Sequence, residues 1–237
     1  MGVAWASLEP RCGSHVKMLR ESPCIVVVGA GTGVGKTHVS CALVAELRRR
    51  GVAIEARKPV ESGYADVESD AERLAMAAGH ATFRPRYAFV EAASPHRAAR
   101  RAGVRIELTE LLAWCPRSGG WLIETAGGLL SPLSESLSNL DFTAALEPAA
   151  VVLVVANRLG ALHDVRACQL ALATRELTAQ VVLSEPANGD EATLTNSEEL
   201  AQLGWAATSI EFPRAFLDDS KTKAAASGLA DALSQGG

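Results

Sequence analysis

A glycine-rich segment, GAGTGVGKTH from Gly29, directly follows an apolar run and precedes a stretch with helical spacing. In a strand, loop and helix of this kind, the backbone amides between Gly31 and Lys36 can surround phosphate oxygens. Lys36 places a cation on the outer phosphates, and the Thr37 hydroxyl can hold Mg²⁺. Glycines are needed because the chain must approach the phosphates closely. An ordinary glycine-rich turn is the alternative, but GKT in this context predicts a loop that binds ATP or GTP.

The rest of the chain alternates between apolar runs and helical spacing. Buried strands are predicted at CIVVVG from Cys24, VAIEAR from Val52, WLIET from Trp121, AVVLVVA from Ala150 and AQVVLS from Ala179. Helices are predicted over 37–51, 70–78, 107–114, 140–146, 164–176, 197–203 and 221–233, and the polar segment 185–199 is predicted to be a surface loop. This alternation predicts an α/β fold, a three-layer sandwich of the P-loop NTPase type with a mostly parallel central sheet.

The composition is that of one globular domain. The 237 residues are 48% hydrophobic and 21% charged, which is enough to bury a substantial core. We expect a single domain over residues 23–237, preceded by a poorly ordered extension over 1–22 in which Met18 is an alternative start. A formal net charge of −4 provides no basic surface for nucleic acid or an anionic membrane, so neither is expected as a partner.

Cysteine usage and hydropathy bear on the compartment. The five cysteines are Cys12, Cys24, Cys41, Cys115 and Cys168. They form no CxxC pair and have no metal-ligand spacing, which is typical of a reduced protein. The first 22 residues lack the continuous apolar core of a secretory signal, and no segment is long enough to span a bilayer. We therefore expect a cytoplasmic protein.

A second candidate cation lies in the segment RKPVESG, which follows the second predicted strand. Lys58 and Ser62 are expected at the carboxyl end of that strand, which in an open α/β sheet lies beside the phosphate loop. A lysine at a strand end is more often a solvated charge. Behind a phosphate loop, Lys58 is better interpreted as a second cation at the reaction centre.

Two carboxylates are candidates for binding a metal ion. Asp70 follows Ser69, a good helix N-cap, so it can be either an acid that complements the helix dipole or a metal ligand. Glu124 ends a buried strand and precedes the small residues Ala126 to Gly128. A carboxylate at that place suits a Mg²⁺·ATP site because the ion prefers oxygen ligands, whereas the alternative is a solvated glutamate at a strand end.

These segments together resemble the dethiobiotin synthetases, which are related to cobyrinate amidases and partition-type ATPases. From about residue 24 to residue 172 the chain carries the phosphate loop, KPVESG, SDA, ETAGGLLSPL and VVLVVANRLG in the family's order. The SPH segment at Ser94 to His96 is also similar to a family segment near the substrate. Five ordered segments are hard to obtain by chance.

The resemblance implies four sets of site residues. Those around the transferring phosphoryl group are Thr32, Lys36, Lys58 and Ser62. Those that bind the nucleotide are Gly31, Thr32, Gly33, Val34, Gly35, Lys36, Thr37, His38, Glu124, Gly127 and Ser184. Those that bind Mg²⁺ are Thr37, Asp70 and Glu124. Those that contact the second substrate are Ser62, Pro95, Gly160, Ala161 and His163.

The resemblance also implies a reaction and an assembly. The substrates are ATP, CO₂ and a diamino acid, 7,8-diaminononanoate, whose amine takes up CO₂ to form a carbamate. The carbamate attacks the γ-phosphate to give a carbamic-phosphoric anhydride, and the second amine closes the ureido ring and expels phosphate. Family members pair their subunits near the substrate, so a homodimer is expected.

The chain departs from the family pattern at four places. Gly31 replaces the aspartate of a GTDT opening, and Thr125 replaces a glycine after the strand-ending acid. Neither change removes a phosphate or metal ligand. The family's LGxxNH segment, which holds the substrate carboxylate across the dimer interface, is LGALHD here. Its adenine-reading asparagine is replaced near Ser184.

Three other interpretations stay open. A cobyrinate amidase normally carries a glutaminase domain, for which this chain has no spare length. A partition or septum-positioning ATPase usually has a second lysine early in the phosphate loop, where this chain has Ala30 and Gly31. A paralogue that binds nucleotide but has lost the biotin precursor is the third, and the altered LGALHD segment is compatible with it.

Overall fold

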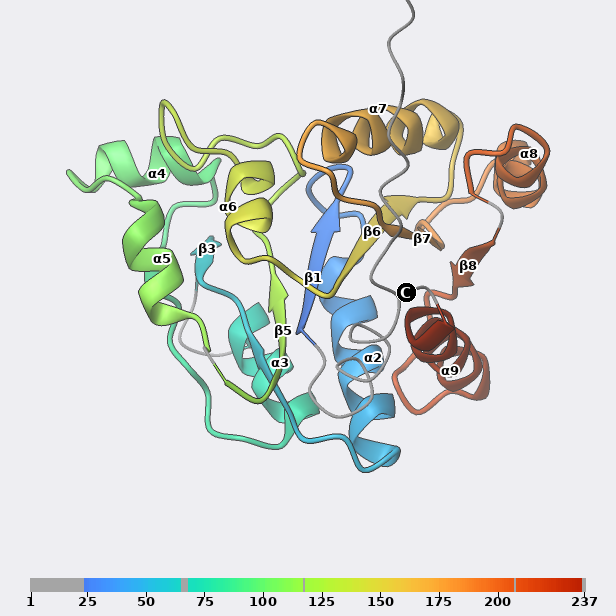
Figure 1. Ribbon diagram of the computed structural model, residues 1–237, viewed down its shortest axis with the longest axis horizontal. Helices are drawn as coiled ribbons and strands as arrows, with labels where there is room; N and C mark the ends of the chain where they lie inside the picture. Colours follow the sequence, from blue (N-terminus) through green and yellow to red (C-terminus); the bar gives the residue numbers. More distant parts are fainter. Residues whose placement is uncertain (1–23, 65–67, 117, 207, 236–237) are drawn as a thin grey trace, which may run out of the picture.

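The computed structural model describes residues 24–64, 68–116, 118–206 and 208–235. The extension expected over 1–22, with Met18 and Cys12, lies outside these residues. Within the described ranges, six strands form one parallel sheet in the order β2-β5-β1-β6-β7-β8 (Figure 1). The strands are β1 Cys24–Gly29, β2 Ile54–Arg57, β5 Gly120–Glu124, β6 Ala150–Ala156, β7 Gln180–Ser184 and β8 Ser209–Phe212. Two short strands, β3 Val60–Ser62 and β4 Tyr87–Phe89, pair separately.

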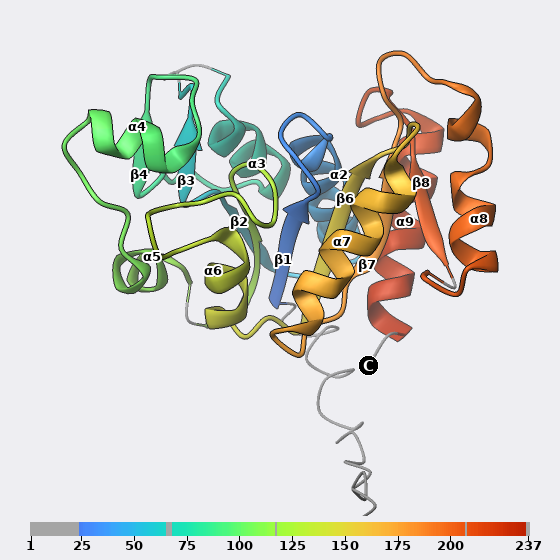
Figure 2. The same ribbon diagram turned by 90° about the horizontal axis from the view of Figure 1, so that it is seen from above.

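Helices cover both faces of the sheet. One face packs against α2 Lys36–Arg49, α3 Asp70–Ala78 and α9 Ser220–Gln235. The other core includes residues of α4 Pro95–Arg101, α5 Leu108–Trp114, α6 Asn139–Ala145, α7 Ala161–Ala173 and α8 Asn196–Gln202. Figure 2 shows α6 and α7 on the opposite side of the sheet from α2, α3 and α9. The predicted three-layer α/β sandwich with a parallel sheet is confirmed.

The apolar runs predicted as strands are buried on both faces. Along β1, Ile25 and Val27 belong to the core under α2, while Val26 and Val28 belong to the core under α6 and α7. Successive strand residues point to opposite faces, so a sheet covered on both sides needs an unbroken apolar run. The same reason explains AVVLVVA in β6, the neighbour of β1.

The strand order brings three functional segments to one edge. All strands of the sheet run in the same direction, so their carboxyl ends share an edge, where ligands of open α/β sheets bind. β5 lies between β2 and β1. The phosphate loop after β1, Lys58 after β2 and Glu124 at the end of β5 therefore meet at that edge.

Several predicted boundaries need correction. The helix expected over 164–176 begins at Ala161, because Gly160 before it adopts a left-handed φ of 96° and the helix turns from there. The loop expected over 185–199 is partly wrong, since it contains the 3₁₀ turn η1 Glu191–Leu194 and the start of α8. RKPVESG does not continue a single strand: β2 ends before Lys58, and Ser62 ends β3. The strands β3, β4 and β8 and helix α4 were not predicted.

Candidate active site

The phosphate loop connects β1 to α2 through two glycines with left-handed backbone angles. Gly33 has φ of 73° and Gly35 has φ of 92°, a region that side chains disfavour. No side chain caps the first turn of α2, and no acid lies in it. Its leading amides are therefore available to an anion, which the helix dipole also favours. The loop has the geometry that the sequence predicted.

Lys36, the first residue of α2, reaches back across the loop. Its Nζ donates a hydrogen bond to the Gly31 carbonyl oxygen at 3.0 Å, and only 6% of the residue is exposed. Burial lowers the pKa of Lys36 to about 8, an effect that nearby Glu124 opposes and nearby Lys58 reinforces. An anionic ligand would stabilise the charged form of this lysine.

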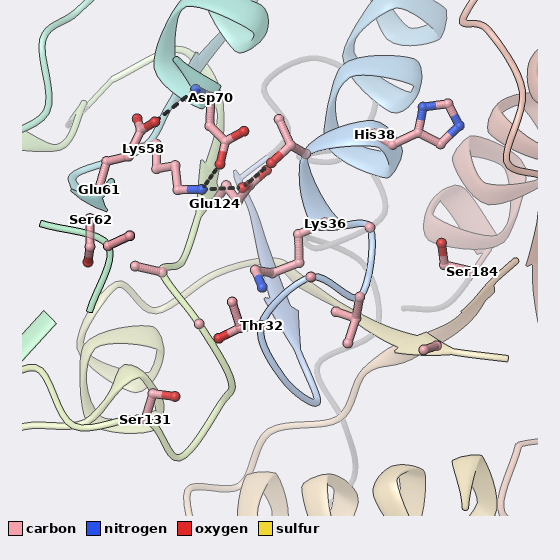
Figure 3. Close-up of a pocket in the computed structure, with 18 of the residues that line it drawn as sticks. Thr32, Lys36, His38, Lys58, Glu61, Ser62, Asp70, Glu124, Ser131 and Ser184 are labelled. Atoms are coloured by element: carbon pink, nitrogen blue, oxygen red, sulfur yellow. Dashed lines mark hydrogen bonds and ion pairs between the residues drawn. The ribbon is translucent and has the colours of Figure 1, made fainter. Parts of the chain in front are cut away.

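Lys58 stands at the centre of a buried charge network (Figure 3). Its Nζ donates to Glu124 Oε1 at 2.9 Å and to Asp70 Oδ2. The Thr37 hydroxyl donates to the same Glu124 oxygen at 2.8 Å. Glu124 is fully buried, and Lys58 is 6% exposed. Residues from α2, β5, α3 and the end of β2 thus form one hydrogen-bonded unit, so Lys58 is a paired, buried cation and not a solvated one.

The ion pairs fix the charge states of this network. Burial alone would lower the pKa of Lys58, but the attraction of Glu124 and Asp70 outweighs burial and raises that pKa above its usual value. Burial alone would raise the pKa of Asp70, yet the ammonium of Lys58 outweighs it and holds that pKa below its usual value. Lys58 is therefore charged at neutral pH.

The three predicted magnesium ligands offer the right donors. Thr37, Asp70 and Glu124 present hydroxyl and carboxylate oxygens around one point, and Glu124 Oε2 is buried without a hydrogen-bond partner. Hard cations such as Mg²⁺ prefer such oxygens. In the described part of the chain, no group of three or more His, Cys, Asp or Glu residues can hold a metal unaided. Mg²⁺ usually completes its coordination shell with water and substrate phosphates.

The segment after β5 closes over the phosphate loop. Gly128 lies so near the loop that a Cβ there would be 3.0 Å from the Ala30 carbonyl oxygen. Asn139 holds the segment by donating to the carbonyl oxygens of Ala126 at 2.6 Å and Gly128 at 2.8 Å, and only 1% of Asn139 is exposed. Asn139 was not predicted as a site residue, because its role depends on where α6 packs.

A cavity of about 1070 Å³ joins these groups. Of the predicted site residues, those on its wall are Thr32, Gly33, Val34, Gly35, Lys36, Thr37, His38, Lys58, Ser62, Asp70, Pro95, Glu124, Gly127 and Ser184. Gly31 lies next to the cavity, because its carbonyl oxygen accepts the hydrogen bond from Lys36. The cavity wall in this single chain does not include Gly160, Ala161 or His163, which lie at the start of α7. Glu61, Arg73 and Glu185 also line the cavity and were not predicted.

The far end of the cavity is made by β7, β8 and α2. His38 Nε2 lies 3.0 Å from the Pro213 carbonyl oxygen, and the His38 ring meets Phe212 edge-on at 5.4 Å. The Arg214 amide donates to Glu185 Oε2 at 2.8 Å. Figure 3 shows Ser184 and His38 on the other side of the phosphate loop from Lys58 and Asp70. His38 therefore secures the segment after β8 beside the loop.

A phosphate loop at the edge of a parallel sheet, facing a second buried lysine and two carboxylates, defines a P-loop nucleotide-dependent enzyme. A family model described as an AAA domain, AAA_26, matches residues 24–206. The ATP-dependent dethiobiotin synthetase BioD of Caulobacter sp. (strain K31) is 41% identical over 177 residues, covering 69% of this chain and 76% of that protein. The chain belongs to the dethiobiotin synthetase family.

Further comparisons extend the range of similarity. The ATP-dependent dethiobiotin synthetase BioD of Mycolicibacterium vanbaalenii is 34% identical over 186 residues, covering 76% of this chain and 82% of that protein. Among solved structures, the signal recognition particle 54 kDa protein of Aeropyrum pernix K1 in complex with GDP aligns with a TM-score of 0.47 at 18% identity, covering 94% of this chain and 51% of that chain.

None of the described helices is long and apolar enough to cross a membrane.

Proposed function

We propose that this enzyme uses Mg²⁺ and ATP to carboxylate 7,8-diaminononanoate with CO₂ and close the ureido ring of dethiobiotin. The observation that carries the proposal is the placement of Lys58. It is buried between Glu124 and Asp70 and lines the same cavity as Lys36 of the phosphate loop. The cavity continues to Ser62 and Pro95, which leaves room for a second substrate beside the nucleotide phosphates.

The reaction needs charge neutralisation and alignment more than covalent help from the protein. A carbamate oxygen of the substrate attacks the γ-phosphorus of ATP, and ADP leaves. The second amine then attacks the carbamate carbon, the ureido ring closes and phosphate leaves. Lys36 and Lys58 supply positive charge to the transferring group, with Thr32 and Ser62 beside it. Thr37, Asp70 and Glu124 would hold Mg²⁺, which would neutralise the charge of the phosphate oxygens.

The segment at the start of α7 supports a homodimeric enzyme of one domain over 23–237. Gly160, Ala161 and His163 lie off the cavity of their own chain. Gly160 and His163 are exposed, so in this proposal they would contact substrate in the cavity of a partner subunit, whereas Ala161 is fully buried in the core. Leu159 is 76% exposed and Leu170 on α7 is 54% exposed, as expected of apolar residues that a second subunit covers. Sedimentation at a mass near twice 24.8 kDa supports this assembly, and sedimentation as a monomer contradicts it.

The experiment that tests the function measures phosphate release from MgATP with bicarbonate, with and without 7,8-diaminononanoate. Mass spectrometry then searches for the ureido product. We expect release that depends on the diamine, with dethiobiotin formed. Nucleotide binding without any response to the diamine would overturn the substrate assignment and leave the nucleotide site intact. A reaction without added Mg²⁺ and with EDTA tests the metal requirement in the same assay.

A further inference from the structure

We propose that Glu61 is a positioning residue that sets where Asp70 stands relative to Lys58 and a bound magnesium ion. Glu61 lies within KPVESG, and the resemblance gives it no role. The inference rests on the proposed function, in which Asp70 helps to hold Mg²⁺.

Both carboxylate oxygens of Glu61 bind the start of α3, and Figure 3 shows the bond to the Asp70 amide. Oε1 accepts a hydrogen bond from the Asp70 amide at 2.9 Å, and Oε2 accepts one from the Ala71 amide at 3.2 Å. These are the first two amides of the helix, which have no partner within it. Glu61 is only 5% exposed, so the carboxylate is a buried two-point clamp on the residue that carries the proposed metal ligand.

The strand that carries Glu61 is itself well fixed. β3 pairs with β4, and Val60 packs in the core with Tyr87 and Phe89. Because strand residues alternate in direction, burial of Val60 turns Glu61 to the other side, toward α3. The two hydrogen bonds of Glu61 therefore hold the first turn of α3 at a fixed position relative to the β3–β4 pair.

Asp70 is where this constraint becomes functional. Its carboxylate binds Lys58, which in turn binds Glu124, and Thr37 binds the same glutamate. A helix end is the part of a helix that frays most readily. A shift of about 1 Å at a reaction centre can lower turnover by about a hundredfold. Fixing the Asp70 backbone thus fixes one side of the whole charge network.

Stabilising the helix alone does not require Glu61. Ser69 already provides an N-cap, because its hydroxyl accepts a hydrogen bond from the Glu72 amide at 3.1 Å. Ser69 and Glu61 therefore bind different amides of the same turn. Of the two, Glu61 binds the amide of Asp70 and Ser69 does not. Substitutions at Ser69 and Glu61 can therefore distinguish an effect on helix stability from an effect on the position of the Asp70 carboxylate.

The test compares Glu61→Ala and Glu61→Gln with Ser69→Ala as the matched control. The affinity of a fluorescent ATP analogue is measured with EDTA and with Mg²⁺. The ratio of the affinity in Mg²⁺ to the affinity in EDTA is the metal gain. We expect both Glu61 variants to lose about tenfold to a hundredfold of that gain, the usual effect of removing a partner of a metal ligand. Affinity in EDTA should stay unchanged. Glu61→Gln keeps the volume of the side chain but offers one oxygen to two amides.

Thermal unfolding separates positioning from folding. Ser69→Ala is expected to lower Tm and retain the full metal gain, because Asp70 stays clamped. A full gain in folded Glu61→Gln, or an equal loss in Ser69→Ala, would overturn the proposal. A wild-type protein whose nucleotide affinity is the same in Mg²⁺ and in EDTA would overturn this inference and the proposed metal site, and would leave the nucleotide site intact. A wild-type metal gain without dethiobiotin formation removes only the substrate assignment.

Discussion

At the phosphate end of the cavity, the Thr37 hydroxyl and the charged side chains of Glu124, Lys58 and Asp70 form one hydrogen-bonded network, whereas the end near Ser184 rests on separate hydrogen bonds. There, His38 binds the Pro213 carbonyl oxygen and packs against Phe212. The phosphate end is built at the ends of the neighbouring strands β2, β5 and β1, and the other end is built from β7 and β8 at the opposite edge of the sheet.

This difference has an energetic meaning. A buried ion pair is costly to assemble, and removing one member leaves the others uncompensated. Such a network holds its charges in fixed places, which suits phosphoryl transfer. A neutral hydrogen bond contributes only about 1 kcal/mol. Substitutions at the phosphate end should therefore affect turnover strongly, while those at the other end should alter stability and nucleotide affinity modestly.

The largest effect is expected from Lys58→Ala. Loss of this cation should lower turnover by at least ~10²-fold, the scale of one lost electrostatic stabiliser. Nucleotide binding should stay largely intact, because Lys36 and the loop amides remain. Phosphate release gives turnover and a fluorescent ATP analogue gives affinity. Lys223→Ala, which removes an exposed lysine on α9, is the control with wild-type rates. Turnover of Lys58→Ala at the wild-type rate would contradict the role.

A smaller effect is expected from pH, through Lys36. Its pKa is lowered to about 8, mainly by burial. Above that pH the Lys36 side chain is mostly deprotonated in the free enzyme. Binding of a phosphate group then requires Lys36 to take up a proton again, which costs free energy. Affinity for ATP should thus fall as pH rises above about 8, by at most tenfold per pH unit for one proton, and this group should have little influence well below it.

The measurement is the dissociation constant of a fluorescent ATP analogue in EDTA at several pH values. Lys36→Arg is the matched control, since arginine stays charged throughout this range and its affinity, whatever its level, should not follow the same slope. An affinity for the wild-type enzyme that is constant from about pH 7 to pH 9.5 would contradict the assignment.

The features that could be predicted from the sequence are mainly those that depend on local segments of the chain. The strand, loop and helix around Lys36 are local, and their apolar run and glycines carry the signal. The position of Lys58 followed from the rule that ligands bind at carboxyl strand ends. The partners of Lys58 followed in part from resemblance, which named Asp70 and Glu124 as metal ligands but did not indicate that both contact the lysine.

The missed features depend on contacts between distant segments. β3, β4 and β8 are only three or four residues long, too short for a periodic signal. The clamp of Glu61 on α3 exists because β3 leaves the main sheet and pairs with β4. Asn139 holds the segment after β5 only because of the way α6 packs. No local pattern in the sequence encodes such contacts.

At the end near Ser184, His38→Ala should have a moderate effect. It removes the contact with the Pro213 carbonyl oxygen and the edge-on contact with Phe212, which together contribute about 1–2 kcal/mol. Tm should fall by a few degrees, and the KM for ATP should rise a few-fold with kcat unchanged. His80→Ala is the matched control, because His80 accepts from the Ala56 amide at 3.1 Å away from the cavity. A fall in kcat specific to His38→Ala would remove the contrast between the two ends.

The smallest effect is expected from Ser184→Ala. The Ser184 hydroxyl lies against the phosphate loop, since a Cβ on Gly35 would be 2.4 Å from its oxygen. A short side chain held there is poorly placed to reach a base, so its removal should change ATP affinity by less than about threefold, within the value of a weak neutral hydrogen bond. Titrations with ATP, GTP and CTP analogues measure this. A tenfold loss confined to ATP would show that Ser184 reads adenine, and the far end would then share the chemical specificity of the phosphate end.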